Sequence, residues 1–327
     1  MKKSIFRLIR KLTLNYYPFR KNHDSLLILI FHKVNDDQDL FFPAVPVKAF
    51  EETCAFLQQY YEIIHFSEIE EYYSKVRKKP AAIITFDDGL FDIFENAFPI
   101  LQKKQMKFNI NIDTEILETN LPQDFVRVYD ILNTTKINSF YNPNFMDEKL
   151  EINNSNSSNT EINFTQILSN LSTEKRRIFV EEMAELTNME QDKFSKVLSI
   201  RNIGELKNSG IVEFGSHSHT HSLLTTISID KVKYELEYSK EVLEKILGEK
   251  VNIIAYPNGE SNEEIDTLAI DLGYSFLLKS NHEINEISKS TIERKSFERI
   301  NQYHQSKEII LAHTFGIVKL LKKIVKK

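Results

Sequence analysis

Two adjacent carboxylates are the first residues of this chain whose types and spacing could do chemistry. Asp87 and Asp88 follow directly on the β-rich run Ala81–Phe86, and Gly89 comes next. Active sites of parallel α/β proteins are built at the carboxyl ends of their strands, where neighbouring side chains point in different directions. One carboxylate can therefore bind a metal while the other faces a substrate. The alternative is an Asp-Asp-Gly turn that only ends the strand.

Three histidines within five residues form a second candidate site. His217, His219 and His221 follow the β-rich run Ile211–Gly215. On a helical turn, His217 and His221 would share one face and could bind one metal ion. A single histidine after a strand is usually structural, but three in five residues are hard to place in a core. His219 has the wrong phase to join the pair, so we expect it to support the other two or to be exposed.

Together, Asp88, His217 and His221 make a two-histidine, one-carboxylate metal site with open positions for water and substrate. Such a metal acidifies its bound water and polarises a carbonyl, while an adjacent carboxylate accepts the proton. Asp87 is placed for that role, and the chemistry is hydrolysis of an amide or ester. The same ligands suit the iron of non-haem oxygenases. However, the strand–helix alternation described next differs from the all-β cores that usually carry that iron site.

The elements that must position these residues alternate between strands and helices. Helical patterns cover 50–57 and 231–247, the second bounded by Ser228 and Gly248. Alternation with few hairpin turns predicts a parallel sheet, open or closed into a barrel. The predicted strands are Leu26–His32, Ala81–Phe86, Phe108–Ile112, Ile211–Gly215, Val251–Tyr256 and Tyr274–Leu278.

Residues from about 113 to 197 break this alternation. The polar run Asn153–Thr160 predicts a loop, and Ser172 begins a predicted helix that reaches Leu186. Because the apolar content of the region is thin, we interpret it as a helical insertion within one barrel domain at 25–300. A basic N-terminal segment (1–24) and a C-terminal basic helix (301–327) flank that domain.

Composition excludes several classes of protein. The chain has 327 residues, of which 41% are hydrophobic and 27% charged, so it can bury one large core or two modest ones. A single cysteine, Cys54, excludes a disulfide framework and a cysteine-built zinc site. The net charge of -5 indicates no nucleic-acid partner.

The charge is unevenly distributed. Residues 1–22 carry seven cations and no acid, and residues 313–327 carry five cations and no acid, so the central body is acidic. Both ends alternate apolar and basic residues at helical spacing. They are expected either to pack on the body or to make peripheral contact with an anionic membrane. No run approaches the ~20 apolar residues of a membrane span, and no signal-peptide pattern is present, so we expect a cytoplasmic protein.

The motifs around Asp87, Asp88 and the three histidines resemble those of the polysaccharide deacetylases of carbohydrate esterase family 4, the group related to chitooligosaccharide deacetylases. The likeness covers about 25–112 and 198–300. Thr85–Gly89 matches the first family motif and His217-Ser218-x-x-His221 the second. Ile254–Gly259 is similar to the Tyr-Pro-x-Gly form of the third, and Leu29–Val34 resembles the first strand of a subgroup often encoded with surface-polysaccharide synthesis.

The resemblance implies a fold, an activity and roles for residues. The fold would be a distorted (β/α)7 barrel, and the activity metal-dependent removal of N-acetyl groups from amino sugars of a polysaccharide or glycan precursor. Asp87 would be the general base, with metal-bound water as the nucleophile. Pro257 and Asn258 would face the substrate, the backbone N–H of Asn258 holding the oxyanion. The metal, zinc first and cobalt, nickel or manganese otherwise, would be bound by Asp88, His217 and His221.

Three departures from the family pattern leave alternatives open. Ala255 stands where many members have an arginine that orients the base, and Arg299 is a candidate replacement. The chain has no tryptophan, so the fourth family motif is missing and only Tyr or Phe could replace it. The general acid is His32 or His313, unless both are structural.

Two further functions remain open. One is a deformylase or deacetylase of a lipid-linked monosaccharide at the membrane surface, for which the basic ends would dock to anionic lipid. The other, motivated by the missing arginine and tryptophan, is a catalytically inactive, carbohydrate-binding relative. The sequence leaves the sugar and the oligomeric state open.

Overall fold

The computed structural model describes residues 23–316 except 136, 138, 143, 146–149, 153–156 and 289–294. The predictions for the basic ends therefore fall on residues 1–22 and 317–327, which lie outside the described residues. None of the described helices combines the length and the hydrophobicity that crossing a bilayer requires.

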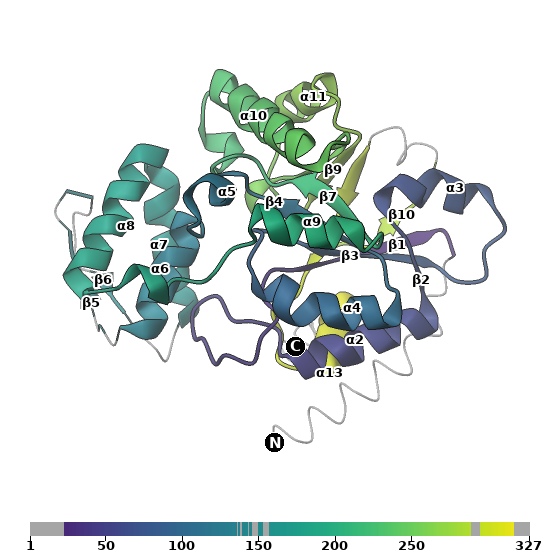
Figure 1. Ribbon diagram of the computed structural model, residues 1–327, viewed down its shortest axis with the longest axis horizontal. Coiled ribbons are helices and arrows are strands. Elements are labelled where there is room, and N and C mark those ends of the chain that lie inside the picture. Colours follow the sequence, from purple (N-terminus) through teal and green to yellow (C-terminus); the bar gives the residue numbers. More distant parts are fainter. Residues whose placement is uncertain are drawn as a thin grey trace, which may run out of the picture.

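Strands and helices alternate along the chain, as the sequence predicts (Figure 1). The strands are β1 (Ser25–Phe31), β2 (Glu62–Ile63), β3 (Ala81–Phe86), β4 (Phe108–Ile112), β5 (Ser139–Phe140), β6 (Leu150–Glu151), β7 (Val212–Ser216), β8 (Ile253–Ala255), β9 (Phe276–Lys279), β10 (Asn285–Glu286), β11 (Ser296–Glu298) and β12 (Ile300–Asn301). The helices are α2 (Val47–Tyr60), α3 (Ile69–Ser74), α4 (Phe98–Lys104), α5 (Glu115–Thr119), α6 (Asp124–Thr134), α7 (Ser157–Asn170), α8 (Thr173–Thr187), α9 (Ile200–Asn208), α10 (Ile229–Leu247), α11 (Glu263–Asp271) and α13 (Lys307–Thr314).

The main sheet is an almost closed barrel whose strands pair in parallel, except that β10 runs antiparallel to β1. Its order is β10-β1-β3-β4-β7-β8-β9-β11, and β12 also pairs with β1. β11 and β12 are consecutive pieces of chain on either side of Arg299. The first pairs with β9 and the second with β1, so one short segment joins the two ends of the sheet. Strands β1, β3, β4, β7, β8 and β9 and the β11–β12 segment thus occupy seven parallel positions around the barrel. The predicted (β/α)7 barrel fold is confirmed.

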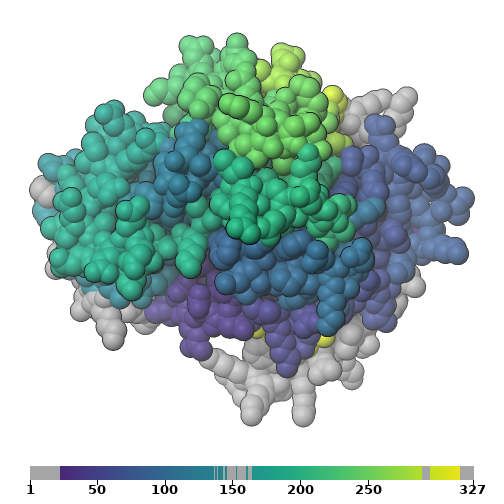
Figure 2. Space-filling model, in the orientation of Figure 1, coloured from purple at the N-terminus to yellow at the C-terminus, as the bar shows by residue number. Residues whose placement is uncertain are grey.

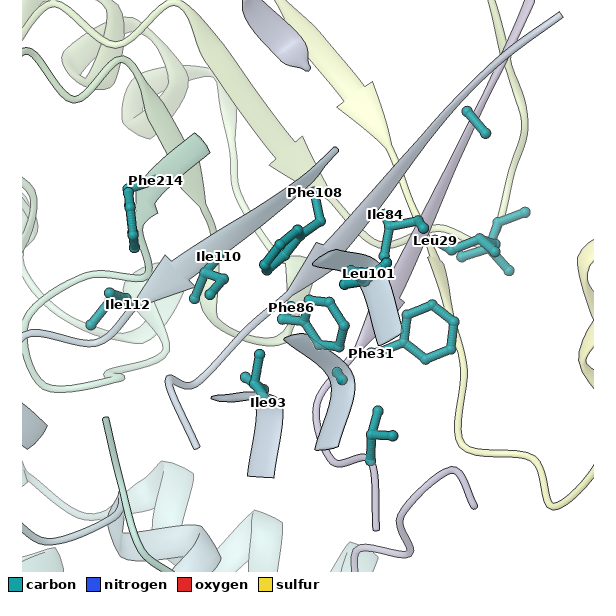
Figure 3. Close-up of a cluster of buried hydrophobic side chains, with 14 of the residues drawn as sticks. Leu29, Phe31, Ile84, Phe86, Ile93, Leu101, Phe108, Ile110, Ile112 and Phe214 are labelled. Atoms are coloured by element: carbon teal, nitrogen blue, oxygen red, sulfur yellow. The ribbon is translucent and has the colours of Figure 1, made fainter. Parts of the chain in front are cut away.

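Alternate residues of the barrel strands serve two hydrophobic cores, because successive side chains point to opposite faces. Leu29 and Phe31 of β1 face outward and pack with residues of the covering helices such as Leu101 (Figure 3). Leu26 and Ile28, from the same strand, belong to a separate cluster inside the barrel. Every residue of β3 is buried, as expected for a parallel strand covered on both faces.

Helices α6, α7 and α8, from the segment between β4 and β7, form a lobe beside the barrel (Figures 1 and 2), whereas α9 of the same segment lies over the barrel. Helices α6 and α8 pack together, and fourteen buried apolar side chains make a core of their own, including Phe41 from the loop after β1. The expectation of thin apolar content there is wrong. The predicted loop is also partly wrong, because α7 begins at Ser157 and buries Thr160.

Helix α13 spans Lys307–Thr314 and lies within the predicted C-terminal helix (301–327). The rest of that prediction, from residue 317 onward, falls outside the described residues. The buried residues of α13, including Ile310 and Ala312, pack in the outer core. The apolar pattern of this helix therefore reflects packing against the barrel, where α13 contacts α2.

Candidate active site

A cavity of about 440 Å³ opens at the carboxyl ends of the barrel strands. The residues that line the cavity come from both the barrel and the inserted lobe. The predicted site residues that line it are Asp87, Asp88, His217, His221, Pro257 and Asn258, together with His32 and Arg299.

Asp88, His217 and His221 converge on one point of this cavity. Asp88 Oδ1 lies 3.4 Å from Nε2 of His217 and 3.5 Å from Nε2 of His221, and one potential ligand atom from each lies within 4.8 Å of the others. Neither oxygen of Asp88 has a hydrogen-bond partner among the described residues. A buried carboxylate without hydrogen bonds is costly unless a cation compensates it. These donors therefore fit a divalent metal ion.

A hydrogen bond selects the tautomer of His217. Its Nδ1 lies 2.7 Å from the carbonyl oxygen of Ala255. A carbonyl can only accept, so Nδ1 carries a proton and Nε2, the ring nitrogen nearest Asp88, is the one that can bind a metal. The His221 ring packs 4.8 Å from that of His217 and 4.6 Å from that of Phe125.

The two imidazoles do not meet by helical spacing, and that prediction is wrong. Residues 217–223 are irregular, and Ser218 and His221 have φ of 69° and 51°. The buried carboxylate of Glu235, on α10, accepts the backbone N–H groups of His219 and Thr220 at 2.9 and 2.8 Å. This carboxylate holds the turn that brings His221 back to Asp88.

Asp88 itself has an unusual backbone. Its φ is 72° and that of Gly89 is 70°. Such conformations cost free energy for a residue with a side chain and persist where the surroundings hold them. Gln123, at the start of α6, donates its Nε2 to the Asp88 carbonyl at 2.7 Å. A side chain at Gly89 would lie 2.6 Å from Cδ1 of Ile116, so the insertion also requires this glycine.

Asp87 is held by two donors. Arg299 Nη1 and Asn111 Nδ2 lie 2.9 and 2.7 Å from its Oδ1. Burial acts to raise the pKa of Asp87, but the Arg299 guanidinium and then His217 lower it, to about 2. The carboxylate is therefore ionised at neutral pH.

The comparison with known families bears on the same residues. Residues 182–277, which span β7 to β9 and include His217 and His221, match the family model described as polysaccharide deacetylase. This part of the chain therefore resembles the polysaccharide deacetylases. No protein with a curated description matches it.

Solved structures of deacetylases share the fold of this chain. The Streptococcus pyogenes deacetylase PplD is 19% identical, with a TM-score of 0.59 over 89% of this chain and 98% of that one. A polysaccharide deacetylase from Bacillus cereus is 19% identical, with a TM-score of 0.58 over 89% of this chain and 69% of that one. IcaB from Ammonifex degensii is 16% identical, with a TM-score of 0.57 over 89% and 97%.

The two candidate acids lie in different places. His32, at the end of β1, lines the cavity with Asp87 and Asp88. His313, on α13, is outside the residues that line it, and its ring packs 4.7 Å from His304 and 5.4 Å from His282. His219 points away from the three predicted ligands, with its Nδ1 2.9 Å from Thr114 Oγ1.

Three residues that support the site were not predicted from the sequence. Asn111 could have been noticed, because strands of a covered parallel sheet are usually apolar throughout and this one contains a polar residue. Glu235 could also have been noticed, since it falls within the buried stripe of α10 beside Leu236. No feature of the sequence indicated Gln123, because its role depends on how the insertion packs over the barrel.

Proposed function

We propose that this chain removes N-acetyl groups from amino sugars of a polysaccharide or glycan precursor, by hydrolysis that depends on a divalent metal. The observation that carries the proposal is the buried Asp88 carboxylate, which lacks hydrogen-bond partners within the described part of the chain and faces two imidazoles beside the ionised Asp87. The match of residues 182–277 to the polysaccharide deacetylase model and the fold shared with IcaB and PplD support the reaction class.

Asp88, His217 and His221 would hold the metal. When bound, it would polarise the acyl carbonyl and lower the pKa of water, and zinc is the first choice for this donor set. Cobalt, nickel or manganese are the alternatives.

The chain's own residues would supply the remaining chemistry. Asp87, held ionised by Arg299, would take the proton of the attacking water. His32, which lines the same cavity, would give a proton to the departing amine. Pro257 and Asn258 line the cavity too, and the backbone N–H of Asn258 would donate to the developing oxyanion. Water and the amide thus become acetate and a free amine.

Acetate release from N-acetylated oligosaccharides tests this function. Metal-free protein should be inactive and zinc should restore activity. Asp87→Asn should lower kcat by at least about 100-fold because the base is lost. Asp271→Asn, an exposed carboxylate on α11, serves as the matched control. An Asp87→Asn variant as active as the wild type would show that the assigned mechanism is wrong.

A second candidate function is removal of an acyl group, acetyl or formyl, from a lipid-linked monosaccharide. The insertion favours it, because Thr165, Leu168 and Ser169 of α7 line the cavity and limit the room around the reacting group. Rates on a polymer, an oligosaccharide and a glycolipid of the same sugar distinguish the two functions. A preference for the polymer would argue against the second.

A further inference from the structure

Three aromatic side chains form one side of the cavity, and we call them the aromatic wall: Phe42, Phe125 and Tyr129. The Phe42 ring lies 5.7 Å from Phe125 and 6.0 Å from Tyr129. Phe42 comes from the loop after β1, and the other two come from α6 of the insertion. The wall therefore joins the barrel to the inserted lobe.

The aromatic wall contacts two residues of the proposed catalytic site, the metal ligand His221 and the proposed acid His32. Phe125 packs 4.6 Å from the ring of His221, and Phe42 lies 5.7 Å from the ring of His32. A group bound against the wall would thus lie next to the metal ligands. Tyr129 is buried, and its hydroxyl lies 3.0 Å from Thr165 Oγ1, which fixes the ring.

The backbone at Phe42 is held in an uncommon conformation. Its φ is 53° and Pro43 follows, although positive φ is a genuine outlier for so bulky a residue. The side chain of Asn133 clamps the preceding residues: its Oδ1 accepts the N–H of Phe41 at 3.0 Å and its Nδ2 donates to the Phe41 carbonyl at 2.9 Å. Strain of this kind persists where neighbours enforce it and is typical of functional sites.

The rest of the lining complements such a wall. Much of it is polar, including Asn258, Glu260, Ser280 and Asn301. A pyranose ring has the same division, with C–H groups on its faces and hydroxyls around its edge. Pockets for small polar ligands combine aromatic surfaces with a few directional polar groups, and about 440 Å³ lies within their size range. The chain has no tryptophan to supply an apolar surface, and these rings supply one.

We propose that the aromatic wall is a sugar-binding subsite, on which Phe42 and Phe125 stack the pyranose ring that carries the acyl group. This inference rests on the proposed function and adds the determinant that selects a sugar rather than any acylated amine. The wall recognises the ring of the sugar, while the metal site and Asp87 act on the acyl group.

Binding and kinetics with two probes test the subsite. The sugar probe is tri-N-acetylchitotriose, and the small probe is 4-nitrophenyl acetate, both with zinc-loaded protein. Phe42→Leu and Phe125→Leu should each raise the KM for the sugar about tenfold, which corresponds to the loss of one aromatic contact. Phe42→Tyr keeps the ring and should raise the KM less than Phe42→Leu does. The KM for 4-nitrophenyl acetate should not change.

The controls separate the subsite from the proposed function. Tyr234→Leu removes an exposed ring outside the residues that line the cavity and should leave both probes unaffected. Zinc content shows whether Phe125→Leu disturbs His221. Saturation-transfer NMR measures sugar binding without turnover, so ring-dependent binding without acetate release would uphold the subsite and reject the deacetylase function.

Three results would overturn the subsite. Leucine variants that bind and process the sugar like the wild type would show that the rings do not contact it. An equal rise in KM for 4-nitrophenyl acetate would place the acyl group, and not the sugar, against the wall. Absence of sugar binding by the wild type would remove the ligand itself.

Discussion

The guanidinium of Arg299 lies 2.9 Å from Oδ1 of Asp87, although 212 residues separate them in the chain. Arg299 occupies the short segment that closes the barrel: its N–H donates to the carbonyl of Lys279 and its own carbonyl accepts the N–H of His282. The side chain is almost completely buried, with 1% exposed. Ala255 stands where many polysaccharide deacetylases have an arginine. Arg299 therefore supplies the positive charge beside Asp87 that Ala255 cannot supply.

The first prediction concerns the pH dependence that this pair sets. Arg299 is the main influence that lowers the pKa of Asp87, to about 2, against the burial that raises it. In Arg299→Met only burial and the weaker neighbours remain, so this pKa rises and Asp87 is protonated at higher pH. The acidic limb of kcat/KM should move to higher pH, with the largest loss of activity at low pH.

Two comparison variants make that experiment specific. Arg299→Lys keeps a positive charge and should show a smaller displacement of the acidic limb. Arg201→Met removes an exposed arginine of α9 and should match the wild type. A uniform fall in kcat/KM at every pH in Arg299→Met would mean that the arginine only supports the fold.

The second prediction concerns metal binding and stability. Asp88 is buried and lacks hydrogen-bond partners among the described residues, so a bound cation should stabilise the fold. Zinc at 100 times its Kd would add about 2.7 kcal/mol to the free energy of unfolding. Thermal unfolding of chelator-treated protein should therefore move upward when zinc is added. Asp88→Asn should abolish this increase in Tm and Asp271→Asn should keep it, whereas equal increases in both variants would place the metal elsewhere.

The strands could be predicted where burial imposes a pattern. All six residues of β3 are buried, and its bounds agree with the apolar run in the sequence. The closing segment β11–β12 could not be predicted, because it is short and polar residues flank Phe297 and Ile300. Its place depends on pairing with β9 and β1, which are distant in the chain.

The candidate site could be predicted as a set of residues but not as a geometry. Asp88, His217 and His221 stand out by type and by their position after strands. The turn that unites them depends on positive φ at Ser218 and on the Glu235 carboxylate, neither of which follows from spacing. Tertiary contacts decide such details, and local patterns do not carry them.

The third prediction follows from Glu235. This carboxylate accepts the N–H groups of His219 and Thr220 and, at 2.6 Å, the Thr220 hydroxyl. Glu235→Gln replaces one acceptor oxygen with a donor, so the turn should loosen and zinc affinity should fall about tenfold, as for other outer partners of metal ligands. Competition with a chromogenic chelator measures this. Glu237→Gln, exposed on the same helix, should bind zinc normally, and equal affinities in the two variants would deny Glu235 its positioning role.

The fourth prediction concerns the close approach of β4 to β7. A side chain at Gly215 would overlap Asn111 Oδ1 and lie 2.8 Å from Cγ2 of Ile253. Gly215→Ala should therefore displace Asn111 from Asp87 and lower kcat. The affinity of the Asp88, His217 and His221 site for zinc should not change. Asn111→Ala should reproduce the loss without crowding, because it removes the same hydrogen bond.

Gly204 on α9 provides the matched control, since a side chain there meets nothing within 4 Å. Gly204→Ala should leave kcat unchanged and stabilise the fold by up to about 1 kcal/mol, because alanine favours helix over glycine. Acetate release, zinc affinity and Tm are measured for all three variants. If Gly215→Ala and Gly204→Ala are equally active, the orientation of Asp87 does not depend on Asn111, and Arg299 alone holds the base.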